Sequence, residues 1–300
     1  MAYKFSHEQL ALLARPASDS EEERMEHARS AVYDALRAGG ILSSDKYEIF
    51  AQGSYANNTN VRNFSDVDIN VCYTDAFYYD LPYGVAKEDY GFTGNVDYSF
   101  SRFKDDIELM LVSRFGRNQV QRKNKCLHVV ENTYRAEIDV VPTWKYRKYK
   151  SRWNYDEGVA LYPDNSFIKV INYPKQHLKN GIEKNTATYR RYKRTVCIIK
   201  NLKFKMEEEG YYRNDKITSF LIEGLLYNVG NDYYNADDWN EILKPIVNKL
   251  WYEAYNNTAY INGFTEVSGL LPLFGISRKW SVDDVRAFMW QLWYYLGYAS

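Results

Sequence analysis

Residues 50–73 read FAQGSYANNTNVRNFSDVDINVCY and contain the most informative pattern in the chain. An extended run up to Gln52 is followed by a turn at Gly53-Ser54, a polar loop, and a β-rich run in which Asp66 and Asp68 are two residues apart. Side chains at i and i+2 of a strand project from one face, so both carboxylates are expected on the same face. Two carboxylates about 4 Å apart repel by several kcal/mol at an effective dielectric of about 20. The pattern therefore favours a site for a divalent cation, which turns that repulsion into attraction.

The turn at Gly53-Ser54 can complete such a site. Mg²⁺ is a hard cation that proteins usually hold with one or two carboxylates together with substrate phosphates. A glycine lets the backbone approach an anion closely, and turn N–H groups and the serine hydroxyl can bind its oxygens. Alone, a glycine-serine turn is most often only a turn, and D-x-D is common at solvated strand ends. Their order along one strand-turn-strand pattern favours a nucleotide site.

Residues 53–69, GSYANNTNVRNFSDVDI, resemble the signature of the DNA polymerase β-type nucleotidyltransferases. This resemblance implies a third carboxylate on a neighbouring strand, and the apolar run RAEIDVV at 135–141 supplies Asp139. The overlapping IDVVPTW at 138–144 resembles in particular the cGAS/DncV-like bacterial enzymes of anti-phage cyclic-oligonucleotide signalling. The resemblance assigns catalytic and metal-binding roles to Asp66, Asp68 and Asp139.

Composition limits the class of protein. The chain has 300 residues, 45% of them hydrophobic, and its 39 basic residues balance 39 acidic ones. This length can bury the core of one large or two medium domains, and the balanced charge gives no argument for a nucleic-acid partner. Cys72, Cys126 and Cys197 lack the spacing of a zinc site or a disulfide framework, which favours a reducing cytoplasm. No apolar run reaches the roughly 18 residues that cross a membrane, and the N-terminus lacks a secretory pattern.

The first half of the chain mixes helical and extended patterns. A capping box is expected at 18–21, before a helix that Gly39-Gly40 ends, and a second helix is expected at 100–115. Residues 74–98 are rich in Tyr, Asp and Gly without periodicity and are predicted to be irregular. Strands are expected at 47–52, 67–73, 119–123, 126–130 and around Asp139. Sheet and helices followed by further helices indicate an α+β fold.

Residues 144–152, WKYRKYKSR, interleave basic and aromatic side chains. Such a run suits a nucleic-acid groove, because phosphates attract Lys and Arg and bases stack on rings. The favoured interpretation is a connector or a patch near triphosphates. Beyond it, residues 163–165 are typical of a turn and mark the expected domain boundary.

Residues 189–205, YRRYKRTVCIIKNLKFK, contain seven Lys or Arg and predict a helix packed on one side. VCIIKNLK resembles the family's helix whose lysine reaches the nucleotide phosphates, which implies that role for Lys200. KITSFLIEGL, at 216–225, puts Ser219 where the family has a second phosphate-binding hydroxyl near a helix N-terminus. The alternative for Ser219 is a simple N-cap.

Residues 172–181, NYPKQHLKNG, resemble the segment that lies beside the bound bases in this family. We hypothesise that Asn172 meets a base edge; its amide is both donor and acceptor and can read uracil or a purine. Phe220 is a weaker candidate for base stacking, with a core position favoured. From Trp239 to the end the pattern is helical and aromatic, with Pro245 a predicted kink and Ser281 a predicted cap.

The resemblance covers nearly the whole chain and implies two lobes. The first is a polymerase β-like nucleotidyltransferase domain with a mixed sheet at 1–165. The second, at 166–300, is an oligoadenylate-synthetase-like helical domain that closes the nucleotide cleft. In this arrangement the three aspartates would hold two Mg²⁺ ions, or Mn²⁺, while Gly53, Ser54, Lys200 and Ser219 would hold phosphates.

The implied function is the synthesis of a cyclic di- or trinucleotide second messenger from nucleoside triphosphates. The product would activate a separate effector during phage infection. The alternative is a non-cyclising nucleotidyltransferase that modifies RNA or protein, with the basic segments as substrate contacts. The sequence leaves open the bases joined, the ring size, the linkage, the activating signal, the effector and the oligomeric state.

Overall fold

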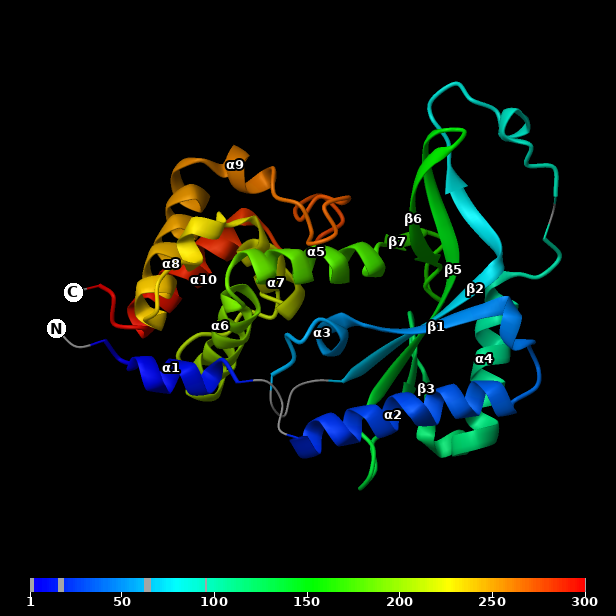
Figure 1. The fold of residues 1–300 in the computed structure, drawn as a ribbon, viewed down its shortest axis with the longest axis horizontal. Helices are drawn as coiled ribbons and strands as arrows, with labels where there is room; N and C mark the ends of the chain where they lie inside the picture. Colours follow the sequence, from blue (N-terminus) through cyan, green and yellow to red (C-terminus); the bar gives the residue numbers. More distant parts are fainter. Residues whose placement is uncertain (1–2, 16–18, 62–65, 95, 300) are drawn as a thin grey trace. The chain divides into compact units, whose positions relative to one another are not determined.

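The computed structural model describes residues 3–15, 19–61, 66–94 and 96–299, which form two compact units (Figure 1). The sheet unit consists of Ser18–Ala56 and Phe64–Pro174, and the helical unit of Met1–Ala17, Asn57–Asn63 and Lys175–Ser300. This division differs from the expected domains 1–165 and 166–300. The short strand Val170–Asn172 pairs with the sheet, so the sheet unit extends to residue 174. The segments Met1–Ala17 and Asn57–Asn63 belong to the helical unit because most of their contacts are with it.

A seven-stranded mixed sheet forms the sheet unit, in the order β1-β2-β5-β4-β3, with β6 paired to β5 and β7 paired to β6. Only the central pair β2 and β5 is parallel among the described pairings; the others are antiparallel. The strands are β1 (Tyr47–Gln52), β2 (Val67–Asp80), β3 (Val120–Arg122), β4 (Leu127–Val129), β5 (Ile138–Ser151), β6 (Asn154–Leu161) and β7 (Val170–Asn172). The predicted mixed sheet is therefore confirmed.

Two sequence expectations are corrected by the length of the central strands. Residues 74–80, predicted to be irregular, continue β2, which after a register shift pairs Phe77 to Asp80 with β5. Residues 144–151, favoured as a connector or a patch near triphosphates, are no connector but continue β5, where buried Trp144, Tyr146 and Tyr149 alternate with more exposed basic residues. Pairing on both sides with β2 and β6 holds this run extended, which its local composition does not reveal.

Helices α2 (Asp19–Ala38) and α4 (Phe100–Phe115) contact each other and the sheet. Ser99 caps α4, predicted at 100–115, by accepting a bond from the Arg102 N–H, and Phe103, Ile107 and Leu111 are among its buried residues. The capping box expected at 18–21 involves a residue outside those the structure describes. Shorter elements of this unit are α3 (Gly53–Ala56) and the 3-10 turns η1 (Ser44–Lys46), η2 (Lys87–Tyr90) and η3 (Arg117–Gln119).

The helical unit packs its helices around one hydrophobic core. Its elements are α1 (His7–Leu13), α5 (Pro174–Ala187), α6 (Arg191–Glu208), α7 (Ser219–Asn228), η4 (Asn231–Tyr234), α8 (Trp239–Asn256), α9 (Thr258–Asn262) and α10 (Val282–Tyr295). Ser281 caps α10 with a capping box, as predicted, and α8 continues through Pro245. None of the helices in the described part of the chain is long and apolar enough to cross a membrane.

Candidate active site

Strand register gathers the predicted aspartates at one end of the sheet. Asp68 on β2 pairs with Asp139 on the parallel neighbour β5, while Gln52 at the end of β1 pairs with Asp68. Asp66 immediately precedes β2, two residues before Asp68. On the other side of β5, the antiparallel β4 places His128 opposite Asp139. The D-x-D motif and the third aspartate, which are distant in sequence, thus meet through one parallel pairing.

Electrostatics show that these carboxyls crowd one another. Burial, as the largest cause, and the negative charges of Asp139 and Asp66 together raise the pKa of Asp68 to about 7. The pKa of Asp66 is raised by burial of its carboxyl and by the charges of Glu137 and Asp139. Ionisation of these carboxyls therefore costs free energy, and a cation bound beside them would lower that cost.

Asp139 has partners that sequence reasoning missed. His128 Nδ1 lies 2.8 Å from Asp139 Oδ1, and Lys123 Nζ lies 3.8 Å from the same oxygen. His128 is buried, and its Nε2 is 3.8 Å from a carboxylate oxygen of Glu137. Burial, together with the neighbouring Asp139, also raises the pKa of the Cys126 thiol to about 12. The alternation of a strand at 126–130 fixes the face on which the His128 side chain lies. It does not show which strand lies beside it, so the sequence alone could not place His128 next to Asp139.

Gly53 is required by the close approach of the turn to Asp68. Its φ of +69° lies in the left-handed region, and a Cβ at this position would come within 2.0 Å of Asp68 Oδ2. Ser54 follows it in α3. The backbone of the predicted phosphate cradle therefore lies directly against a predicted metal ligand.

A buried amide fixes the strands behind these aspartates. Asn70 on β2 accepts a 2.7 Å hydrogen bond from the Thr143 hydroxyl on β5 and donates a 3.0 Å bond to Gln52 Oε1 on β1. Because Asn70 has no exposed surface, these bonds are shielded from water. They hold the register of β1, β2 and β5 two residues from Asp68.

In the helical unit, Lys200 lies in a buried charged cluster. Its Nζ donates a 2.9 Å hydrogen bond to the Thr59 carbonyl, and burial lowers its pKa although Glu223 acts in the opposite direction. Burial would raise the pKa of Glu223, but the hydrogen bond with His177 and the charges of Lys200 and Lys193 hold it below the ordinary value. The Thr59 hydroxyl also lies 3.4 Å from Glu223 Oε2, so the loop at 57–61 is tied to the helices.

The remaining predicted residues lie at the ends of elements. Ser219 is the first residue of α7, and the N-cap is Thr218, whose hydroxyl accepts from the Leu221 N–H, so the N-cap interpretation of Ser219 is wrong. Asn172 is exposed at the end of β7, and Tyr173 separates it from the first residue of α5. Phe220 is 37% exposed, so the favoured core position is not what the structure shows.

Within residues 3–15, 19–61, 66–94 and 96–299, no three His, Cys, Asp or Glu side chains converge closely enough to hold a metal ion. The three aspartates thus share one end of the sheet without forming a closed ligand set.

Comparison with protein families gives a match to the cGAS/DncV-like nucleotidyltransferase C-terminal helical domain over residues 179–297. Among curated proteins, the cyclic dipyrimidine nucleotide synthase CdnE of Cecembia lonarensis is 46% identical, over 98% of this chain and 99% of the relative. The cyclic dipurine nucleotide synthase of Elizabethkingia meningoseptica is 36% identical, over 98% of this chain and 99% of the relative.

Solved structures give the same result. The structure of the Rhodothermus marinus CdnE c-UMP-AMP synthase with Apcpp and Upnpp has a TM-score of 0.85 and 30% identity, over 99% of this chain and 98% of that one. The structure of the Elizabethkingia meningoseptica CdnE cyclic dinucleotide synthase with GTP and Apcpp has a TM-score of 0.82 and 34% identity, over 98% and 100% of the two chains.

Proposed function

This chain belongs to the cGAS/DncV-like nucleotidyltransferases as a cyclic dinucleotide synthase of the CdnE clade, and we propose that Asp66, Asp68 and Asp139 form its catalytic centre. The observation that carries the proposal is the parallel register of β2 and β5, which pairs Asp68 with Asp139. Membership in this clade replaces the alternative of a non-cyclising transferase that modifies RNA or protein.

The donor chemistry of the three aspartates fits Mg²⁺. All are hard oxygen ligands, and burial of Asp68, together with the negative charges of Asp139 and Asp66, raises its pKa, so a cation bound beside it would be favoured. We propose that the three residues hold two Mg²⁺ ions, which Mn²⁺ can replace. When bound, such ions lower the pKa of the attacking ribose hydroxyl and offset the charge of the triphosphate.

The chain's own residues would position the reactants. Asp139 would receive the proton of the attacking hydroxyl, with His128 orienting its carboxylate through the 2.8 Å contact. Phosphoryl transfer asks little covalent chemistry of the protein, so positioning and electrostatic stabilisation carry most of the rate. The register bonds of Asn70 support this by fixing the strands that carry the aspartates.

Phosphate binding is assigned to Gly53, Ser54, Lys200 and Ser219. Ser54 follows the turn that touches Asp68, and Ser219 lies in the first turn of α7, where N–H groups are not yet used by the helix. For Lys200 the proposal requires its ammonium to exchange the Thr59 carbonyl for a phosphate oxygen. Its lowered pKa is consistent with such an exchange, because an anion would stabilise the charged form.

We propose a cyclic dipyrimidine as the product and Asn172 as a base-reading residue. The Cecembia lonarensis relative is a cyclic dipyrimidine nucleotide synthase at 46% identity over nearly the whole chain. Asn172 is exposed, and its amide can both donate to and accept from a uracil edge. An Asn172→Ser variant should shift incorporation among the four NTPs; an unchanged preference would remove Asn172 from base selection. The product would act in the cytoplasm on a separate effector during phage infection.

The decisive experiment identifies the product. Pure protein is incubated with all four NTPs and Mg²⁺, treated with phosphatase, and analysed by mass spectrometry beside an Asp66→Asn/Asp68→Asn control. A phosphatase-resistant product without terminal phosphates, absent from the control, is expected, and its mass names the bases. An equal yield from the control would overturn the assignment of the aspartates, and a cyclic product that contains any purine would overturn the dipyrimidine proposal.

A further inference from the structure

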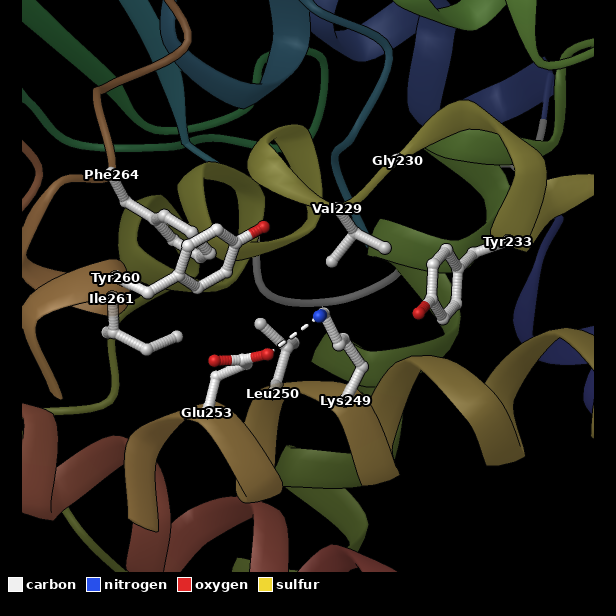
Figure 2. A pocket seen from close by; sticks show the side chains of 9 residues that line it. All are labelled: Val229, Gly230, Tyr233, Lys249, Leu250, Glu253, Tyr260, Ile261 and Phe264. Carbon is white, nitrogen blue, oxygen red and sulfur yellow. Dashed lines mark hydrogen bonds and ion pairs between the residues drawn. The ribbon is translucent and has the colours of Figure 1, made fainter. Parts of the chain in front are cut away.

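A cavity of about 170 Å³ lies inside the helical unit, between α8, α9 and the segment that follows α7 (Figure 2). Lys249, Leu250 and Glu253 come from α8, and Tyr260 and Phe264 come from α9 and the residues after it. Tyr233 stands on the opposite side, as Figure 2 shows. None of the lining residues is among those assigned above to metal or nucleotide binding, so this is a second candidate site.

The polar part of the cavity is an ammonium beside a carboxylate. Lys249 Nζ donates a 2.7 Å hydrogen bond to Glu253 Oε1, and this bond raises the pKa of Lys249. The Glu253 side chain is only 11% exposed, whereas the Lys249 side chain is 33% exposed. An ammonium has three N–H donors, and a carboxylate can accept at both oxygens. The pair can therefore donate and accept at neighbouring points, and Figure 2 shows both groups facing the cavity.

The rest of the lining is aromatic and apolar. The Lys249 ammonium lies 5.2 Å from the centroid of the Tyr260 ring, which meets the Phe264 ring edge-on at 5.2 Å. Leu250 is 1% exposed and contributes to the cavity floor. Aromatic and apolar walls with few polar groups are typical of sites for small planar ligands. In size the cavity is close to engineered cavities of about 150 Å³ that hold benzene, which suits a single six-membered ring.

We propose that this cavity binds a pyrimidine base, with its ring against Tyr260, an N–H of the base donating to Glu253 and a ring carbonyl accepting from Lys249. A planar ring that carries a donor beside an acceptor matches both charged groups at once. A purely apolar ring would displace water from Lys249 and Glu253 without replacing the hydrogen bonds that the water makes to them. The proposal stands apart from the catalytic site, because it uses none of the catalytic residues.

The test uses the full chain and two ligands that differ by one methyl group. We expect 1-methyluracil, which keeps one ring N–H, to bind in ligand-observed NMR titrations. We expect 1,3-dimethyluracil, which has the same ring and carbonyls but no N–H, to bind at least about tenfold more weakly. No detectable binding of 1-methyluracil, or equal binding of the two ligands, would overturn the proposal.

Two substitutions locate the binding. Glu253→Gln and Lys249→Met should each weaken 1-methyluracil binding at least about tenfold, and Lys244→Met, a change on the same helix outside the cavity, should leave it within about twofold. If Glu253→Gln destabilises the fold, the chain without substitutions gives the same information. Bound 1-methyluracil should protect Lys249 against chemical acetylation, which mass spectrometry measures. Binding that survives Lys249→Met, or an unprotected Lys249, would place the ligand elsewhere and overturn the proposal.

Discussion

Asp68 in the sheet unit and Glu223 in the helical unit are both largely buried carboxyls, yet their pKa values move in opposite directions. Burial, together with the negative charges of Asp139 and Asp66, raises the pKa of Asp68 to about 7. For Glu223, burial acts the same way, but His177, Lys200 and Lys193 reverse it and leave the pKa lowered. The desolvation is common to both sites, and the sign of the neighbouring charges makes the difference.

This comparison distinguishes a site proposed to bind a ligand, around Asp68, from a charged cluster that stabilises the fold, around Glu223. Around Glu223 the protein supplies the opposite charge itself, and the Thr59 hydroxyl and His177 complete the hydrogen bonding. Around Asp68 the sheet register brings like charges together, and a bound cation, as proposed above, would compensate them. We therefore expect removal of a carboxylate to cost activity at the first site and stability at the second.

The largest effect is expected from the first site. In Asp66→Asn/Asp68→Asn, formation of the cyclic product should fall by about 1,000-fold or more, because charges aimed at the transition state are lost. Its free energy of unfolding in EDTA should not decrease, since the substitution relieves repulsion. Mass spectrometry and urea unfolding measure the two quantities. Asp75→Asn on the same strand, where Asp75 pairs with Lys46 at the surface, should keep activity within about twofold. A destabilised double variant would break the comparison.

The second site should respond in the reverse manner. Glu223→Gln leaves Lys200 and Lys193 buried without their counter-charge, so the free energy of unfolding should fall by about 3 kcal/mol. The matched control is Glu207→Gln, which removes a 2.8 Å pair with Lys203 on the same unit and should cost about 1 kcal/mol or less. Equal losses in the two variants would show that the buried cluster contributes no more than a single partly buried pair along one helix.

Divalent metal should distinguish the sites next. Mg²⁺ at about 100 times its dissociation constant should raise the free energy of unfolding of the natural chain by about 2.7 kcal/mol for each bound ion, relative to EDTA. Glu223→Gln should keep this increment, and Asp66→Asn/Asp68→Asn should lose it. Urea unfolding with and without Mg²⁺ measures the difference. An increment retained by the aspartate variant would mean that Mg²⁺ binds elsewhere.

Much of the first site could be predicted from sequence because its signals are local. Strand faces follow directly from the alternation around Asp66, Asp68 and Asp139. Gly53 is also a local signal, because only a residue without a Cβ allows the turn to approach Asp68 so closely. The pairing of Asp68 with Asp139 was expected through the family resemblance, since no local pattern states which strands are neighbours. For the same reason His128 was missed: its role depends on β4 pairing with β5.

The second site was harder to predict because it depends on contacts between distant segments. Lys200 was expected at phosphates from its motif, but its burial against Thr59 depends on a loop 141 positions away. The extension of β2 to Asp80 and of β5 to Ser151 likewise follows from pairing, which extends strands through polar sequence. Glu223 gave no sequence signal of its own, since an acidic residue in a helix usually faces water.

The smallest effect expected is a pH dependence that belongs to the second site alone. Glu223 has a lowered pKa in the folded chain, so the stability it contributes is present above the unfolded value of 4.5 and is lost as pH falls through the folded value. The difference in unfolding free energy between the natural chain and Glu223→Gln should therefore shrink by about 1 kcal/mol or more when the pH is lowered from about 6 to about 3.5. Glu207→Gln should show a smaller change, because the Glu207 side chain is 20% exposed against 6% for Glu223 and its ion pair is with a single lysine. Urea unfolding in EDTA at each pH measures both differences. A difference that stays constant to pH 3.5 would show that the positive neighbours do not stabilise the Glu223 carboxylate, and the contrast with Asp68 would then rest on strand register alone.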